Sequence, residues 1–157
     1  MSTQTTILAS ERFARHALET RFEDLSEDAL CQAKVFILDT IGVGISGSTA
    51  GGAEGLWAAA RSWGSGDEAV AWGRRGRVPA PAAALLNGFQ IHCQEYDCVH
   101  EGAVLHPLAT LLPAVLAHAD RAGGVSGRDL LAAVAVGVDI SAGLGIASRS
   151  AMRFFRP

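Results

Sequence analysis

The chain has 157 residues and a formal net charge of −3, a length typical of one domain with its own hydrophobic core. The small negative charge and the dispersed basic residues argue against nucleic acid as a main partner, because nucleic-acid-binding proteins normally carry a basic patch. Three cysteines and a polar N-terminus without a secretory pattern predict a cytoplasmic protein without a disulfide framework.

Helical periodicity dominates the first part of the chain. Apolar spacing predicts a first helix over residues 6–18. Ser26 is expected to cap a second helix, which should fade at the glycines Gly42, Gly44 and Gly47. A third helix is predicted over residues 53–63, before the next pair of glycines. The first third of the chain is therefore predicted to be all-α.

The middle of the chain is less regular. Residues 68–72 are apolar with turn signals on both sides, which predicts a single short strand or an extended connector. The basic residues come closest to forming a cluster in a Gly-rich turn that contains Arg74, Arg75 and Arg77. We interpret this turn as a surface loop rather than an anion site. Pro79 and Pro81 suit the first turn of a helix, which is predicted over residues 82–92.

Two further helices are predicted in the second half. Pro107 begins one that runs through His118, and Ser126 with Asp129 resembles a capping box before the other, at residues 130–147. The last helix approaches the length of a membrane span, but Asp139 and glycines interrupt it. We therefore predict a buried central or interface helix and no membrane partner. Because the second half of the chain is so apolar, we also expect it to bury surface against a partner subunit or a further part of the chain.

Residues 92–106 concentrate the reactive side chains. They hold three of the five histidines, three acids and two cysteines, and they lie between two apolar helices. Catalytic groups are often carried by such loops on a rigid scaffold. The two other histidines, His16 and His118, lie on predicted helices, and we interpret both as structural.

Three interpretations of this segment remain open. The residues could be ordinary polar loop residues, with a histidine capping a helix end. They could form a zinc site, although the spacing differs from that of a usual zinc knuckle; the ligands would be His92, Cys93, Cys98 and His100. They could also perform acid–base catalysis, with a histidine working near neutral pH and a carboxylate that orients it; the candidates are His106 or His100 with Glu95 or Asp97.

The same segment resembles the signature of the 2-methylcitrate dehydratase (MmgE/PrpD) family. The matching residues are Leu86-Asn87-Gly88, His92, the run Glu95-Tyr96-Asp97-Cys98-Val99-His100, and His106-Pro107. The flanks at residues 38–42 and 126–131 are also similar, so the resemblance extends from Ile7 onward. It implies a helical, bundle-like domain, of which residues 1–157 would be the N-terminal part. Members of the family have a smaller α/β lid domain, place the active site between the two domains, and commonly form homodimers.

The resemblance also implies a function. Family members are lyases and related enzymes (dehydratase, decarboxylase or epimerase type) that act on small polycarboxylic acids without a metal, iron–sulfur cluster or other cofactor. Position by position, Glu95 and Asp97 take the places of two family aspartates, and His106 takes that of the active-site histidine. We expect catalysis by His106 with Glu95, Asp97 and His100, and substrate contacts by His92 and Val99. Cys98 replaces a family acid and Val99 a threonine, which leaves room for a different substrate because a lost hydroxyl removes a hydrogen bond.

The family's catalytic lysines and lid are expected beyond Pro157, so the 157-residue chain alone is predicted to be inactive and to self-associate. The alternative function is a non-catalytic, truncated helical domain that dimerises or binds a partner.

Overall fold

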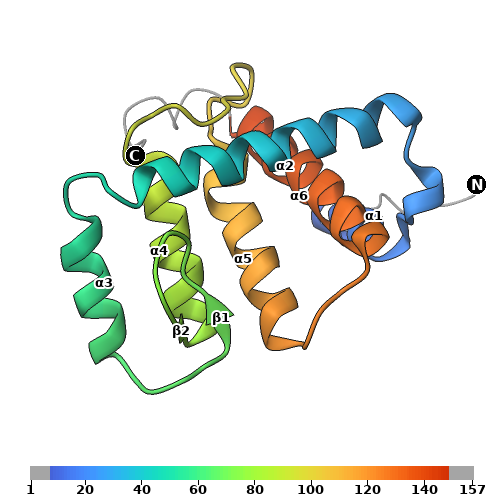
Figure 1. Cartoon of the computed structure of the whole chain (residues 1–157). Coiled ribbons are helices and arrows are strands. Elements are labelled where there is room, and N and C mark those ends of the chain that lie inside the picture. The colour runs from blue at the N-terminus through green and yellow to red at the C-terminus, as the bar shows by residue number, and fades with distance from the viewer. Residues whose placement is uncertain (1–7, 149–157) are drawn as a thin grey trace, which may run out of the picture.

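The computed structural model describes residues 8–148, and within them the chain is almost entirely helical (Figure 1). The predicted all-α class is confirmed. The elements are α1 (Ala9–Glu19), the 3₁₀ helix η1 (Phe22–Asp24), α2 (Glu27–Gly47), α3 (Ala53–Ser62), β1 (Ala69–Val70), β2 (Arg77–Val78), α4 (Ala80–His92), α5 (Pro107–Arg121) and α6 (Gly127–Ala147).

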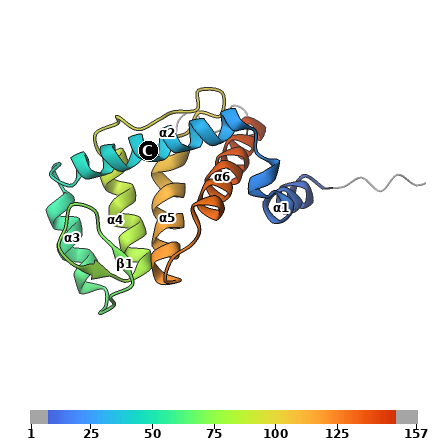
Figure 2. The same ribbon diagram turned by 45° about the vertical axis from the view of Figure 1, so that its right-hand side comes forward.

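Helix α2 lies across one end of a row formed by α3, α4, α5 and α6 (Figures 1 and 2). Neighbours in this row contact each other, and α2 contacts α4, α5 and α6. Helix α1 packs against α6 at the far end of the row. The loop from α4 to α5 lies at the α2 end of the row.

Helix α2 ends at Gly47, the last of the three glycines at which it was predicted to fade, and it continues through Gly42 and Gly44. Close packing explains why glycine occupies positions 44 and 47 of this helix. A Cβ on Gly44 would lie 2.6 Å from the ring of Trp72, and a Cβ on Gly47 would overlap the backbone carbonyl of Gln90 in α4. The helix propensity lost at each glycine, about 1 kcal/mol, is therefore offset by the close approach of α2 to α4.

The helix-start signals predicted at Ser26, Pro107 and Ser126 agree with the structure. Ser26 Oγ accepts a hydrogen bond from Ala29 N at 3.1 Å, and Ser126 Oγ accepts one from Asp129 N at 3.1 Å. Pro107 occupies the first position of α5, where a missing N–H costs nothing. Helix α4 begins at Ala80, earlier than predicted, because Pro79 already serves as its N-cap residue.

Residues 68–72 contribute one strand of a small antiparallel hairpin, with Ala69 opposite Val78. The buried side chain of Asn87 holds this hairpin to α4. Its Nδ2 donates to the carbonyl of Val70 at 2.9 Å, and its Oδ1 accepts from Trp72 N at 2.9 Å. Near the hairpin, Arg74 pairs with Glu54 of α3, which supports the interpretation of the arginine group as a structural loop.

Helix α6 is not the buried central helix that we predicted. It lies at an edge of the row, and Leu144 and Ile146 are each 55% exposed. Its apolar residues surround the helix, but only part of that surface packs against α1, α2 and α5. Helices α2 and α6 are each long and apolar enough to cross a membrane. The core helices of soluble proteins meet the same criterion of length and composition. The absence of a membrane partner and the interface role of α6 remain predictions.

His16 joins α1 to α6. Its Nε2 lies 3.2 Å from Asp139 Oδ2, and its Nδ1 lies 3.1 Å from the hydroxyl of Thr20. This contact agrees with a structural role for His16 and gives Asp139 a partner on α1. His118 is exposed on α5.

Candidate active site

The loop between α4 and α5 folds back on itself and brings the two helix ends together. Glu95 and Val104 adopt left-handed backbone conformations, with φ of 53° and 59°. His100 N donates to the carbonyl of Leu105 at 2.8 Å, and its Nδ1 accepts a hydrogen bond from Ala103 N at 3.0 Å. This tight turn places His106, at the start of α5, beside His92, at the end of α4.

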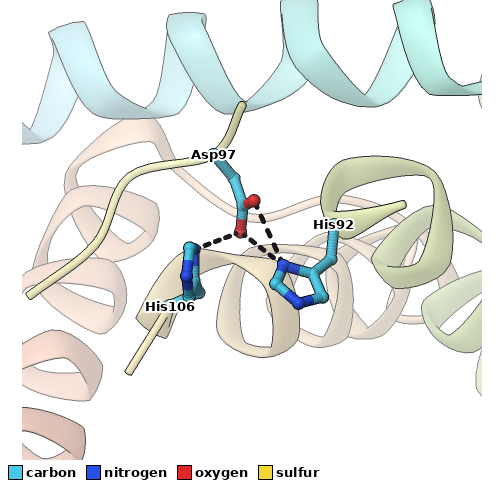
Figure 3. Close-up of side chains that lie close together, drawn as sticks. All are labelled: His92, Asp97 and His106. Atoms are coloured by element: carbon cyan, nitrogen blue, oxygen red, sulfur yellow. Dashed lines mark hydrogen bonds and ion pairs between the residues drawn. The ribbon is translucent and has the colours of Figure 1, made fainter. Parts of the chain in front are cut away.

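Asp97 lies between the two histidines (Figure 3). Its side chain is fully buried, whereas those of His92 and His106 are 23% and 22% exposed. His92 Nδ1 lies 3.2 Å from Asp97 Oδ1, and His106 Nδ1 lies 3.1 Å from Asp97 Oδ2. The ring centroids are 4.7 Å apart, with the planes inclined at 64°.

The two contacts with Asp97 differ in kind. The His92 contact has the geometry of a hydrogen bond. His106 Nδ1 is buried and close to the carboxylate, but it is not aligned for a hydrogen bond with any described group. Because an ionised carboxylate can only accept, we infer that both imidazoles carry a proton on Nδ1. Each Nε2 is then left with a free lone pair, which can accept a proton.

An open pocket of about 1030 Å³ lies against both histidines, between α4, α5 and α6. Its walls are mainly apolar and include Leu85, Gly88, Phe89, Leu105, Ala109 and Leu144. Three residues with hydroxyl groups also line it, Thr110, Ser141 and Ser148. Within residues 8–148, no lysine or arginine lines the pocket. Asp97 is behind the histidines, where it can orient them without facing the pocket.

The other predicted site residues do not join this cluster. Glu95 is exposed, Val99 is 52% exposed, and the Nδ1 of His100 is engaged within its own turn. None of the three lines the pocket. The loop turns Asp97 inward and leaves its neighbours at the surface. The roles expected for Glu95, Val99 and His100 remain predictions.

The proposed four-ligand zinc site is not assembled in the described part of the chain. Cys93 Sγ points to the backbone carbonyls of Gln90 and Gly47, and Cys98 packs against the apolar core between α2 and α5. Burial raises the pKa of both thiols, which disfavours the thiolate form that binds metal. The structure gathers a different set of potential ligands, comprising His92, Asp97 and His106, whose ligand atoms all lie within 4.8 Å of one another.

Comparison with known proteins adds independent information. Residues 11–155 match the family model described as the MmgE/PrpD N-terminal domain. The chain is 34% identical over 135 residues to the cis-aconitate decarboxylase-like protein oryM of Aspergillus oryzae, and 30% identical over 135 residues to human cis-aconitate decarboxylase. These alignments cover 82% and 83% of this chain but only 28% of each relative.

Proposed function

Because the chain belongs to the MmgE/PrpD family, we propose that it provides the helical, N-terminal part of a lyase site for a small polycarboxylic acid. The observation that carries this proposal is the pairing of His92 and His106 with one buried carboxylate at the wall of a pocket. Similarity to cis-aconitate decarboxylases supports lyase chemistry at this site.

His106 is the proposed proton-transfer residue. In a dehydration, its Nε2 removes a proton from the carbon next to a carboxylate, the electron pair forms the C=C bond, and the hydroxyl leaves with a proton as water. In a decarboxylation, a C–C bond breaks to release CO₂, and the same nitrogen returns a proton to the carbanion. His92 is placed to supply or accept the second proton. Each well-placed acid or base contributes about 10²–10⁴-fold to the rate.

Asp97 is the proposed positioning residue. It accepts a hydrogen bond from Nδ1 of His92 and lies beside Nδ1 of His106, so that each Nε2 is directed away from the carboxylate, and its charge stabilises the imidazolium that forms during proton transfer. A neutral amide at position 97 would bind Nδ1 less strongly and stabilise that cation less. The buried carboxylate therefore assists both histidines at once.

Binding the carboxylates of a substrate requires groups that the described pocket does not supply. The free N–H groups in the first turn of α5 can contribute, because helix N-termini favour anions. Cationic side chains would have to come from residues outside 8–148, in line with a site that the isolated chain does not complete. We propose no cofactor for this reaction.

The test is His106→Gln in a preparation that turns over a polycarboxylate such as cis-aconitate or 2-methylcitrate. We expect kcat to fall at least about 10²-fold, because a glutamine cannot take up the proton. His118→Gln is the matched control, since His118 is exposed on the same helix, and it should leave kcat unchanged. Near-normal turnover by His106→Gln would remove His106 from the mechanism.

A second candidate function is a dimerising or binding module without turnover, and one surface of α2 favours it. Val35, Leu38, Gly42 and Ile45 are all exposed and recur at intervals of three and four residues, so they lie on one face of α2. Two such faces can pack against each other, as in a helical seam. We propose that this face contributes to a homodimer. Because all three cysteines are unpaired, we also propose a cytoplasmic location.

Light scattering tests the dimer. Leu38→Glu should shift the chain towards the monomer, because it places a charge in the middle of the proposed seam. Leu18→Glu on α1 is the control, since Leu18 is equally exposed, at 72% against 74% for Leu38. Equal molar masses for both variants and the wild type would exclude this face as the contact.

A further inference from the structure

We propose that His92, Asp97 and His106 form a binding site for a divalent transition-metal ion of the zinc type, and that the bound ion inhibits the acid–base site. The ligand atoms are the two Nδ1 atoms and the carboxylate oxygens of Asp97. The ion is an inhibitor of this site rather than a cofactor.

The spacing of the three groups suits such an ion. Zinc binds histidine nitrogen at 2.0–2.1 Å and carboxylate oxygen at about 2.0–2.2 Å, so neighbouring ligands of a tetrahedral ion lie roughly 3.3–3.6 Å apart. The two N···O distances in the structure are 3.2 and 3.1 Å. All three ligand atoms lie within 4.8 Å of one another, so a rearrangement of the two rings would bring them onto one ion.

Burial and charge favour a cation at this position. The carboxylate of Asp97 is fully buried, and no lysine or arginine within residues 8–148 forms an ion pair with it. A buried negative charge is unfavourable unless it is paired. His106 Nδ1 is also buried and lacks a hydrogen bond in the described structure. One cation would satisfy both groups.

The chemistry of the three groups indicates which ions would bind. Three protein ligands are typical of zinc sites that keep a water or a small molecule as the fourth ligand. Two imidazoles select zinc, copper or nickel over magnesium, which prefers oxygen ligands.

Inhibition follows from the atoms that the ion occupies. A metal on Nδ1 requires each neutral imidazole to carry its proton on Nε2. This is the opposite of the tautomer that acid–base catalysis uses, so neither Nε2 can accept a proton while the ion is bound. Asp97 is engaged by the same ion and no longer orients the rings.

The test is calorimetric titration of the tag-free 157-residue chain with zinc chloride, in a Cys31→Ser background that removes the exposed thiol. We expect one ion per chain. Asp97→Asn and His92→Gln should each weaken binding at least about 10-fold, as expected for loss of a metal ligand or its close support. His118→Gln should leave the affinity unchanged, and magnesium chloride should give no binding heat. Circular dichroism of each variant verifies that it is folded.

Cobalt substitution identifies the ligands directly. Nitrogen and oxygen ligation by His92, Asp97 and His106 predicts a cobalt complex without a thiolate charge-transfer band in the near ultraviolet. A thiolate band that disappears in Cys93→Ser or Cys98→Ser would overturn the proposal in favour of a cysteine site. Absence of zinc binding, or unchanged affinity in both Asp97→Asn and His92→Gln, would also overturn it. Because the titration needs no turnover, these outcomes are independent of the proposed lyase activity.

Discussion

The Nδ1 atom of His106 lies 3.1 Å from Oδ2 of Asp97, although His106 begins one helix and Asp97 lies within the preceding loop. The same carboxylate contacts His92 at the end of the previous helix. One buried acceptor therefore sets the orientation of two rings that come from different elements. Predictions about this site follow from that shared acceptor.

The first prediction concerns the tautomers of the neutral histidines. His92 and His106 should carry the proton on Nδ1, because Asp97 faces that atom in both. His100 should carry it on Nε2, because its Nδ1 accepts a hydrogen bond from Ala103 N. Long-range ¹H–¹⁵N spectra at a pH where the rings are neutral distinguish the two forms. A common tautomer for all three rings would contradict the arrangement in Figure 3.

The second prediction concerns stability. Asp97→Ala should lower the free energy of unfolding by about 1–3 kcal/mol, because it removes the buried acceptor of His92 Nδ1 and the carboxylate beside His106 Nδ1. Glu95→Ala is the control, since Glu95 is exposed two residues away, and it should change stability by less than about 0.5 kcal/mol. Urea denaturation measures both. Equal values for the two variants would mean that the cluster contributes nothing to folding.

The third prediction compares two glycines of the same helix. Gly47→Ala should destabilise the protein by about 2–3 kcal/mol, because the new methyl group would overlap the carbonyl of Gln90 and push α2 from α4. Gly42→Ala should instead stabilise it by about 0.5–1 kcal/mol, because that position is open and alanine favours a helix. Thermal melting of the pair tests the close packing of α2, and a melting shift of the same sign in both would contradict it.

The fourth prediction concerns the attachment of the hairpin to α4. Asn87→Asp keeps the size of the side chain but loses the donor to Val70, and it places a buried charge beside that carbonyl. We expect a loss of about 1–3 kcal/mol. Hydrogen exchange should locate the change, with faster exchange across the hairpin at residues 69–78 and little change in α6. Unchanged protection throughout the hairpin would contradict the role of Asn87.

The fifth prediction concerns the thiols. Burial raises the pKa of Cys93 and Cys98, whereas Cys31 is exposed. A higher pKa leaves less thiolate at neutral pH, so Cys31 should be alkylated first and the other two more slowly. The alkylation rates of Cys93 and Cys98 should keep increasing with pH beyond the range in which an ordinary thiol becomes fully ionised. Mass spectrometry of iodoacetamide-treated protein provides the order, and early modification of Cys98 would contradict it.

The sequence by itself determined the helical class, the start signals of three helices and the reactive segment. Helical spacing, Ser26, Ser126 and Pro107 act through local physics, since a capping hydroxyl or a proline in the first turn needs no distant contact. The sequence also indicated the family, because the residues around His92 and His106 occur at the family's spacing. Both the class and the family are confirmed.

The tertiary structure decided which residues of that segment meet. The sequence contained one signal for the pairing, a histidine in the last turn of a helix with an aspartate five residues later, but it did not distinguish Asp97 from Glu95. That choice depends on the left-handed turn at Glu95, which faces solvent while Asp97 is buried between α4 and α5. The length of α2 was likewise decided by packing, because its glycines act through contacts with Trp72 and Gln90 that are distant in the chain. Local preferences determine where helices begin. Contacts between elements determine how far α2 extends and which side chains form the site.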